Sequence, residues 1–122
     1  MAAMPLTVRA AFEAELATAR STSDLDTMWR ALERAHILSQ EWPWPHTRSH
    51  WHMFVLALRT RDRREALGQA LRLAVAGVGS SVGRVPIGNT GRAAVGITAP
   101  MPIPEDLARI LAEGRRESAV QG

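Results

Sequence analysis

The sequence predicts an all-α protein: a compact bundle of four helices plus a short C-terminal helix, with a long Gly/Pro-rich segment packed over it. Three observations predict this fold class. Apolar residues recur at spacings of three and four in successive stretches, as they do on one face of a helix. Residues that cap or break helices separate these stretches. At 122 residues, the chain has the length of one domain, so residues 1–122 are expected to share one core.

The first helix is expected over residues 7–20, where Val8, Phe12, Leu16 and Ala19 fall on one line. The second is expected over residues 24–39, with Ser23 as its N-cap and two aspartates in its first turn. Its apolar line includes His36. An imidazole in this position must find a partner, because an unsatisfied buried polar group costs about 1–3 kcal/mol.

A turn rich in Trp and Pro (residues 41–45) ends the second helix, because proline removes a backbone donor and restricts the residue before it. The third helix is expected over residues 46–59. His46 and His50 share one line of this helix, and His52 points in roughly the opposite direction. Apolar residues cover most of the remaining circumference, which is typical of a central, buried helix.

The fourth helix is expected over residues 63–76, with Asp62 as N-cap and Glu65 as the capping-box acid. Gly77 or Gly79 would end it. The apolar residues that this helix is expected to bury are Leu67, Leu71, Ala74, Val75 and Val78.

Residues 77–104 contain six of the nine glycines and four of the seven prolines. We expect residues 77–103 to form an irregular segment that packs over the helices as a cover. Pro104 would open a last helix over residues 104–113, and Gly114 would stop it. The tail, residues 114–122, is expected to be loose.

The composition excludes several kinds of chemistry. Without Cys there are no disulfides, thiolate nucleophiles or thiolate metal ligands. The chain also lacks Lys and Tyr, which removes Schiff-base chemistry and phenol acids. No apolar stretch reaches the roughly 18 residues of a membrane span, and no secretory signal is visible, so a cytoplasmic location is the expectation.

Side chains spaced by three or four residues share one face of a helix. Glu33 and His36 have this spacing at the end of the second helix, as do His46 and His50 at the start of the third. The end of one helix faces the start of the next in an antiparallel hairpin, so these four side chains should surround one point. Three imidazoles and one carboxylate suit a divalent transition metal such as zinc, iron, copper, nickel or cobalt. The sequence therefore predicts a mononuclear metal site with Glu33, His36, His46 and His50 as ligands.

Three further residues are candidate additional ligands, each with a competing structural role. Met53 follows His50 by one turn and would favour copper, or it simply packs in the core. Glu65 is the best remote carboxylate for a second ion, or it caps its helix. His52 is near in sequence but faces away. If Glu33 stays outside the coordination sphere, three histidines leave an open position, which a metalloenzyme would use to activate water or oxygen.

Two resemblances rest on these same stretches. The motifs ERAHILSQ (33–40), HTRSH (46–50), RDRREALGQ (61–69) and VPIGNTG (85–91) resemble a family of small bacterial proteins classed as a domain of unknown function. This resemblance implies a compact helical protein and brings no established activity. A weaker likeness, to a tetratricopeptide helix, rests on Trp29 and Leu32. That family has Gly where Glu33 stands and an aromatic where His36 stands, and no second copy of the repeat is visible.

Three functions compete at this point. The leading interpretation is a cytoplasmic metal-binding protein in which the Gly/Pro-rich segment covers the site. The alternative is a metal-free helical interaction module whose histidines are hydrogen-bonded core residues and whose partner is another protein or a second copy of the chain. The third is anion or nucleic-acid binding through the arginines at 59–64, which a formal net charge of only +3 argues against.

Overall fold

The computed structural model describes residues 3–81 and 102–121. They form five helices and, within these ranges, no strand, which confirms the all-α prediction. The helices are α1 (Leu6–Ser21), α2 (Leu25–Ser39), α3 (Pro43–Arg59), α4 (Arg63–Ser81) and α5 (Glu105–Gln121). Among these residues, no helix combines the length and apolarity needed to cross a membrane.

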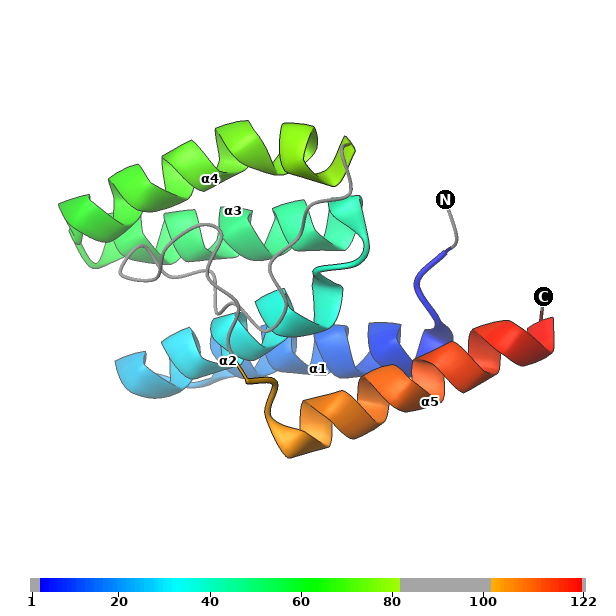
Figure 1. The fold of residues 1–122 in the computed structure, drawn as a ribbon. Coiled ribbons are helices and arrows are strands. Elements are labelled where there is room, and N and C mark those ends of the chain that lie inside the picture. Colours follow the sequence, from blue (N-terminus) through cyan, green and yellow to red (C-terminus); the bar gives the residue numbers. More distant parts are fainter. Residues whose placement is uncertain (1–2, 82–101, 122) are drawn as a thin grey trace.

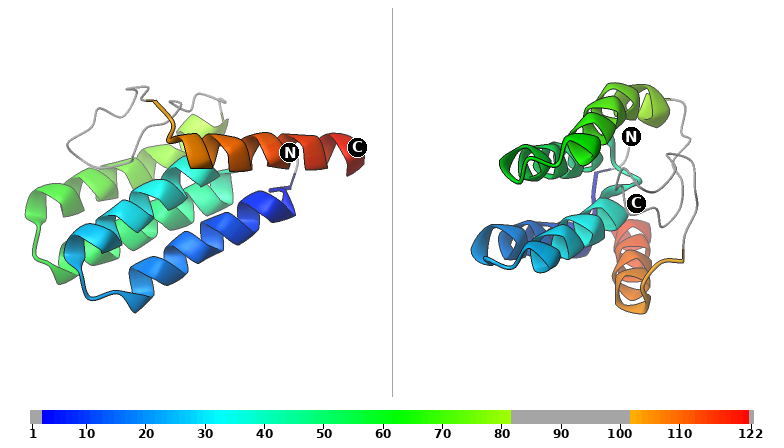
Figure 2. Two further views of the ribbon diagram at one scale, coloured as in Figure 1. Left: turned by 90° about the horizontal axis from the view of Figure 1, so that it is seen from below. Right: turned by 90° about the vertical axis from the view of Figure 1, so that its left-hand side faces the viewer.

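The helices form two hairpins that stack on each other (Figures 1 and 2). The first hairpin is α1 with α2, the second is α3 with α4, and α2 and α3 pack together between them. Helix α5 lies along α1 and α2 on the side away from α4. Among the five helices, α4 contacts only α3, whereas α5 contacts both α1 and α2.

An apolar core runs through the contact between α1, α2, α3 and α5. Its largest fully buried side chains include Phe12, Leu16, Leu38, Met53 and Leu107. Burial of each such side chain stabilises the fold by about 1.5–3 kcal/mol before the entropy cost of ordering it. The predicted apolar line of α1 is confirmed in this core.

Side-chain caps mark the starts of α2 and α4, with one difference from the prediction. Asp24, rather than Ser23, is the N-cap of α2, since its carboxylate accepts from the backbone N–H of Thr27 at 3.0 Å. Asp62 caps α4 as predicted and accepts from the N–H of Glu65 at 3.0 Å. Between α3 and α4 the chain turns through Arg61, whose φ of 58° lies in the left-handed region usual after a helix end.

Helix α3 begins at Pro43, three residues earlier than predicted. Prolines at 43 and 45 both fall in its first turn, where backbone N–H groups have no partner inside the helix and their absence costs nothing. The connection from α2 is therefore tighter than the expected loop of about six residues. Its short span holds the end of α2 directly against the start of α3.

Helix α5 runs to Gln121, so the predicted stop at Gly114 and the loose tail over 114–122 are wrong up to that residue. Gly114 instead marks a close approach to α1, since a Cβ there would lie 2.5 Å from Cγ2 of Val8. One turn later, the Glu117 carboxylate accepts from the N–H groups of Leu6 and Thr7 at 3.0 and 3.1 Å. Helix α1 has no side-chain cap of its own. Its free donors therefore hold the end of α5 in place.

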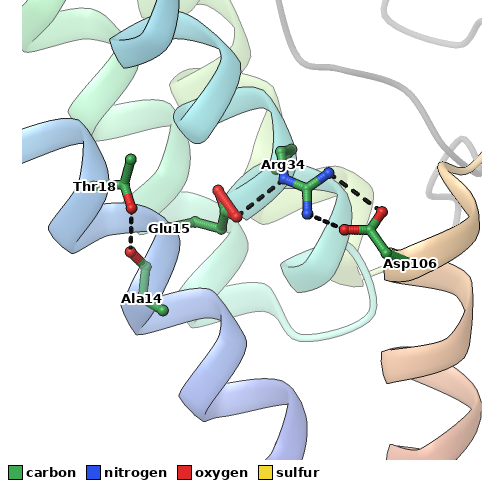
Figure 3. A network of polar contacts seen from close by, with 5 residues as sticks. All are labelled: Ala14, Glu15, Thr18, Arg34 and Asp106. Atoms are coloured by element: carbon green, nitrogen blue, oxygen red, sulfur yellow. Dashed lines mark hydrogen bonds and ion pairs between the residues drawn. The ribbon is translucent and has the colours of Figure 1, made fainter. Parts of the chain in front are cut away.

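Arg34 links three helices in a charged network that the sequence did not indicate (Figure 3). From α2, its Nε donates to Glu15 of α1 at 3.0 Å, while its two terminal nitrogens reach the carboxylate of Asp106 in α5. The Asp106 and Glu15 carboxylates raise the pKa of Arg34 further above its usual value, against the opposing effect of burial. The planar guanidinium of Arg34 can donate to both carboxylates at once, which the single ammonium group of a Lys would do less well.

The predicted burial of the α4 apolar residues is wrong for the four whose side chains the structure describes, and the side chain of Val78 lies outside that part. Leu67 and Leu71 are 75% and 55% exposed, and Ala74 and Val75 are also exposed. The buried face of α4 is polar instead, with Glu65 and Gln69 at 4% and 0% exposure. Helix α3 is likewise not buried all round, since Trp44, Trp51 and Leu58 are exposed.

The irregular segment predicted from residue 77 does not start there, because α4 continues past both glycines to Ser81. The predicted cover over the helices falls in residues 82–101, outside the described residues.

Candidate metal centre

The junction of α2 and α3 places three histidines against one another. His36 lies in the last turn of α2, while His46 and His50 lie in the first two turns of α3. Two backbone bonds hold the turn between them: the Trp42 N–H donates to the Ser39 carbonyl at 2.9 Å, and the His46 N–H to the Trp42 carbonyl at 3.0 Å. The structure thus brings these three predicted site residues together.

The three rings meet through the same atom. The distances between Nε2 atoms are 2.9 Å for His36 and His46, 3.1 Å for His36 and His50, and 3.2 Å for His46 and His50. All three residues are buried. Ring centroids lie 4.6–4.8 Å apart and no two rings are parallel, so the rings converge edge-on at one point.

Hydrogen bonds among the rings cannot satisfy this triangle. Each Nε2 atom carries either a proton, and donates, or a lone pair, and accepts. Because three Nε2 atoms share only these two states, at least two of them must be in the same state. These two atoms then face each other as donor and donor or as acceptor and acceptor. At 2.9–3.2 Å, such a pair is repulsive and lacks the free energy of a hydrogen bond. One cation that accepts all three lone pairs removes the conflict.

A polar chain from α4 decides the protonation of His50. Gln69 Nε2 donates to the Glu65 carboxylate at 2.8 Å, which turns Gln69 Oε1 toward His50 Nδ1 at 2.7 Å. The amide oxygen can only accept, so Nδ1 carries the proton. The Nε2 lone pair of neutral His50 therefore points into the triangle. Metal-ligating histidines almost always donate their other ring N–H to an acceptor such as a carboxylate or a carbonyl, and the Gln69 amide oxygen takes this place behind His50.

Two of the imidazoles are held in the neutral form. Burial lowers the pKa of His46 to about 4, with smaller contributions from His50 and Arg72. Burial also lowers the pKa of His50 to about 4, and the hydrogen bond that its Nδ1–H donates to Gln69 only partly opposes this effect. Neutral imidazole is the form that binds a metal. These rings are ready to coordinate at neutral pH without first losing a proton.

The size of the triangle fits one ion held by all three nitrogens. Nitrogens at these separations lie about 1.8 Å from their common centre, close to the metal–nitrogen distance of about 2.0–2.1 Å, so His36, His46 and His50 would all reach the same ion.

His46 Nδ1 is buried and has no hydrogen-bond partner among the described residues. A buried imidazole nitrogen left unpaired costs about 1–3 kcal/mol. His46 therefore sits in the cluster at an energetic cost, which coordination of its other nitrogen would offset.

The remaining candidates lie around this centre in different ways. Among the described residues, potential ligand atoms within 4.8 Å of one another come from the three histidines. Glu33 is not part of this group and is half-buried one turn before His36. Met53 is fully buried within the apolar core. Glu65 reaches the centre through Gln69 instead of directly.

His52 points away from the cluster, as its position on the helix predicts. It lines a separate pocket of about 370 Å³ between the first hairpin and α3, with Arg20 and Arg59 among its neighbours. Burial, together with the charges of Arg48 and Arg20, lowers its pKa.

Sequence reasoning missed Gln69 and Arg72. Both are buried, and both lie on the same face of α4 as Glu65 at spacings of four and three residues. A line of three polar side chains in an otherwise apolar helix was the signal that could have found them. It indicates a helix whose polar face turns inward.

One comparison with known proteins gives a match. A model for a family described as "Protein of unknown function (DUF3703)" matches residues 6–111. No curated protein and no solved structure matches the chain. The family model covers most of the chain, and it includes all three histidines and the polar face of α4. The chain therefore belongs to the DUF3703 family.

Proposed function

We propose that this member of the DUF3703 family binds one transition metal ion through the Nε2 atoms of His36, His46 and His50. The observation that carries the proposal is the closed triangle of these three atoms, with separations of 2.9–3.2 Å. No assignment of protons makes all three contacts hydrogen bonds, whereas three lone pairs on one cation make all three favourable.

The donor set narrows the identity of the ion. Three imidazoles suit zinc, copper, iron(II), nickel and cobalt, whereas calcium and magnesium prefer oxygen ligands. The chain has no cysteine to provide a softer ligand. Among the described residues, the converging group contains no carboxylate, which argues against a second ion at the same point.

The polar chain behind His50 supports the same function. Gln69 and Glu65 hold His50 in the tautomer that leaves its Nε2 lone pair free. This support is independent of the triangle, because it comes from α4 and concerns His50 Nδ1 instead of Nε2.

The metal-free alternative, an interaction module with structural histidines, leaves these features without a cause. It requires a repulsive pair of Nε2 atoms in the protein interior. It also buries three rings side by side where apolar side chains would pack at lower cost.

Metal content is the direct test. The chain is purified without a histidine tag, and bound metal is measured by mass spectrometry. The expected result is one ion per chain, or uptake of one ion with a rise in melting temperature when zinc, iron, copper, nickel or cobalt is added. At a free metal concentration of 100 times the dissociation constant, binding should raise the free energy of unfolding by about 2.7 kcal/mol. Absence of both results contradicts the proposal.

Two neighbouring histidines give a matched pair of variants. His50→Ala removes one ligand and should weaken binding by more than the roughly 10–100-fold that loss of an outer partner costs. His52→Ala, two residues away in the same helix, should leave the affinity unchanged because His52 lies in another pocket. Equal effects of the two substitutions would assign the binding to something other than the triangle.

A further inference from the structure

A second cavity lies away from the histidine triangle. It is the pocket of about 370 Å³ that His52 lines, between the end of α1, the first half of α2 and the second half of α3. The α1–α2 and α3–α4 turns both lie at one end of the fold, whereas the α2–α3 turn that holds the triangle lies at the opposite end (Figures 1 and 2). We name this cavity the arginine pocket and define it by the polar residues that line it: Arg20, Thr22, His52 and Arg59.

The remaining lining of the arginine pocket is apolar. Leu32 and Leu56 are buried, and Met28 and Val55 are half-buried beside them. A ligand that covers these side chains removes apolar surface from water, which favours a ligand with an apolar body. The volume of about 370 Å³ lies near the lower end of the range of small-molecule sites, roughly 300–1,000 Å³, so the ligand should be small.

The charged residues that line the pocket are both positive. Arg20 and Arg59 line it, and no acidic residue does so. Within residues 3–81 and 102–121, neither of these arginines makes an ion pair, whereas Arg34 and Arg48 are each held by carboxylates. The pocket therefore brings together two guanidinium groups that no carboxylate of the described residues neutralises.

Negative charges near the pocket do not cancel these two positive charges. Glu13 lies close enough for its charge to act on His52, but its carboxylate already accepts from Arg48 at 2.6 Å. Helices α1 and α3 end at the pocket, and each helix C-terminus carries a partial negative charge of about half a unit. Because Arg20 and Arg59 each carry a full positive charge, the pocket should attract an anion.

Thr22 and His52 add donors without charge. Thr22 Oγ1 accepts from the Asp24 N–H at 3.2 Å, and its own hydroxyl proton has no acceptor among the described residues. The His52 ring makes no hydrogen bond to that same part of the chain. Burial, together with the charges of Arg48 and Arg20, lowers the pKa of His52, so its ring is neutral at pH 7 and keeps one N–H to donate.

We propose that the arginine pocket binds a small organic anion that carries one carboxylate or phosphate head group on an apolar body. The head group would accept from Arg20 and Arg59, since guanidinium groups bind both kinds of oxyanion through paired, charge-assisted hydrogen bonds. The apolar body would lie on Leu32 and Leu56. The proposal does not depend on the metal site, because none of the three histidines of the triangle lines the pocket.

Four small compounds test the two parts of the ligand separately. Hexanoate and hexyl phosphate have both an anionic head group and an apolar chain, whereas hexanol lacks the charge and acetate lacks the chain. Each compound is titrated into the full chain while the ring signals of His52 are followed by NMR, with His52→Gln to assign them. Hexanoate or hexyl phosphate should shift these signals saturably in the millimolar range, and hexanol and acetate should bind about 10-fold more weakly or less.

Surface variants place the anion in the pocket without threatening the fold. Arg20→Gln and Arg59→Gln each remove one charged donor at an exposed position. Each should raise the hexanoate dissociation constant about 10-fold, the lower end for a hydrogen bond to a charged group, because exposed charges are screened by water. Arg30→Gln is the matched control: Arg30 is exposed on α2 and does not line the pocket, so this substitution should leave the dissociation constant unchanged.

A chelator separates this site from the proposed metal, because a carboxylate can also bind a metal ion. Hexanoate should bind the arginine pocket equally well before and after chelation.

Three results would overturn the proposal. The first is the absence of a saturable shift with both hexanoate and hexyl phosphate. The second is binding of acetate or hexanol as tight as that of hexanoate, since the pocket would then not read both parts of the ligand. The third is binding that disappears with the chelator, or that responds equally to Arg30→Gln and Arg59→Gln, since the anion would then lie elsewhere.

Discussion

The Nδ1 atom of His50 lies 2.7 Å from Oε1 of Gln69, and this contact fixes which nitrogen of the ring carries the proton. Gln69 is completely buried, and Glu65 holds its amide in orientation. Helices α3 and α4 are thus joined by a buried polar chain that ends at the proposed metal site.

The first prediction concerns Gln69. Gln69→Leu removes the acceptor from the His50 Nδ1–H and leaves both that group and Glu65 without this partner. We expect metal affinity to fall by about 10–100-fold, measured by calorimetric titration with zinc. The folded state should also lose about 1–3 kcal/mol for the unsatisfied buried groups.

Gln69→Glu is the matched control, because it keeps an oxygen that can accept from Nδ1 at nearly the same position. It should retain much of the affinity that Gln69→Leu loses. Equal affinity for zinc in the wild type and in Gln69→Leu would show that the chain from Glu65 to His50 does not orient a ligand.

The histidine triangle illustrates what local periodicity can predict. His36 on the core face of one helix, and His46 and His50 on one face of the next, follow from the 3.6-residue repeat and a short turn. The same repeat separates His52 from them. All of this information lies within residues 33–53, so no distant contact was needed.

The polar face of α4 was not predicted, for a physical reason. A run such as Leu67, Leu71 and Val75 normally turns inward, because burial of apolar surface dominates folding. Here the inward face of α4 lies next to a buried imidazole that needs a hydrogen-bond partner. Its buried residues are therefore polar: Glu65, Gln69 and Arg72. The sequence shows two faces on this helix, but it does not show which one meets α3.

Stability without metal should depend on pH through His46 and His50. In the folded protein their pKa values are lowered to about 4, while an unfolded histidine has a value near 6.5. The unfolded chain therefore takes up protons first as pH falls. The stability is fully present above pH 6.5 and is lost between about pH 6.5 and 4, by up to about 1.4 kcal/mol per pH unit for each group.

Urea unfolding of the metal-free protein at several pH values measures this slope. The double variant His46→Gln/His50→Gln has no imidazole to protonate at these positions and should lose most of the slope. His52→Gln is the control; it should lose a smaller part, since burial lowers the pKa of His52 as well. A metal-free wild type whose stability is constant from pH 7 to pH 4 would contradict the neutral, buried cluster.

The last prediction concerns Gly114, where two effects of opposite sign compete. Replacing Gly by Ala inside a helix normally stabilises it by up to about 1 kcal/mol. Here the added Cβ would lie 2.5 Å from Val8 Cγ2 and 3.3 Å from Pro5 Cγ. Val8 is fully buried and its branched side chain has little freedom to move, so α5 would have to shift away from α1.

Overpacking of this kind costs about 1–3 kcal/mol, which outweighs the gain in helix propensity. Gly114→Ala should therefore lower the free energy of unfolding, as measured by urea denaturation. Ala108→Gly, at an exposed position in the same helix, measures propensity alone and should cost about 1 kcal/mol. If Gly114→Ala instead stabilises the protein, α5 does not pack on α1 through this glycine.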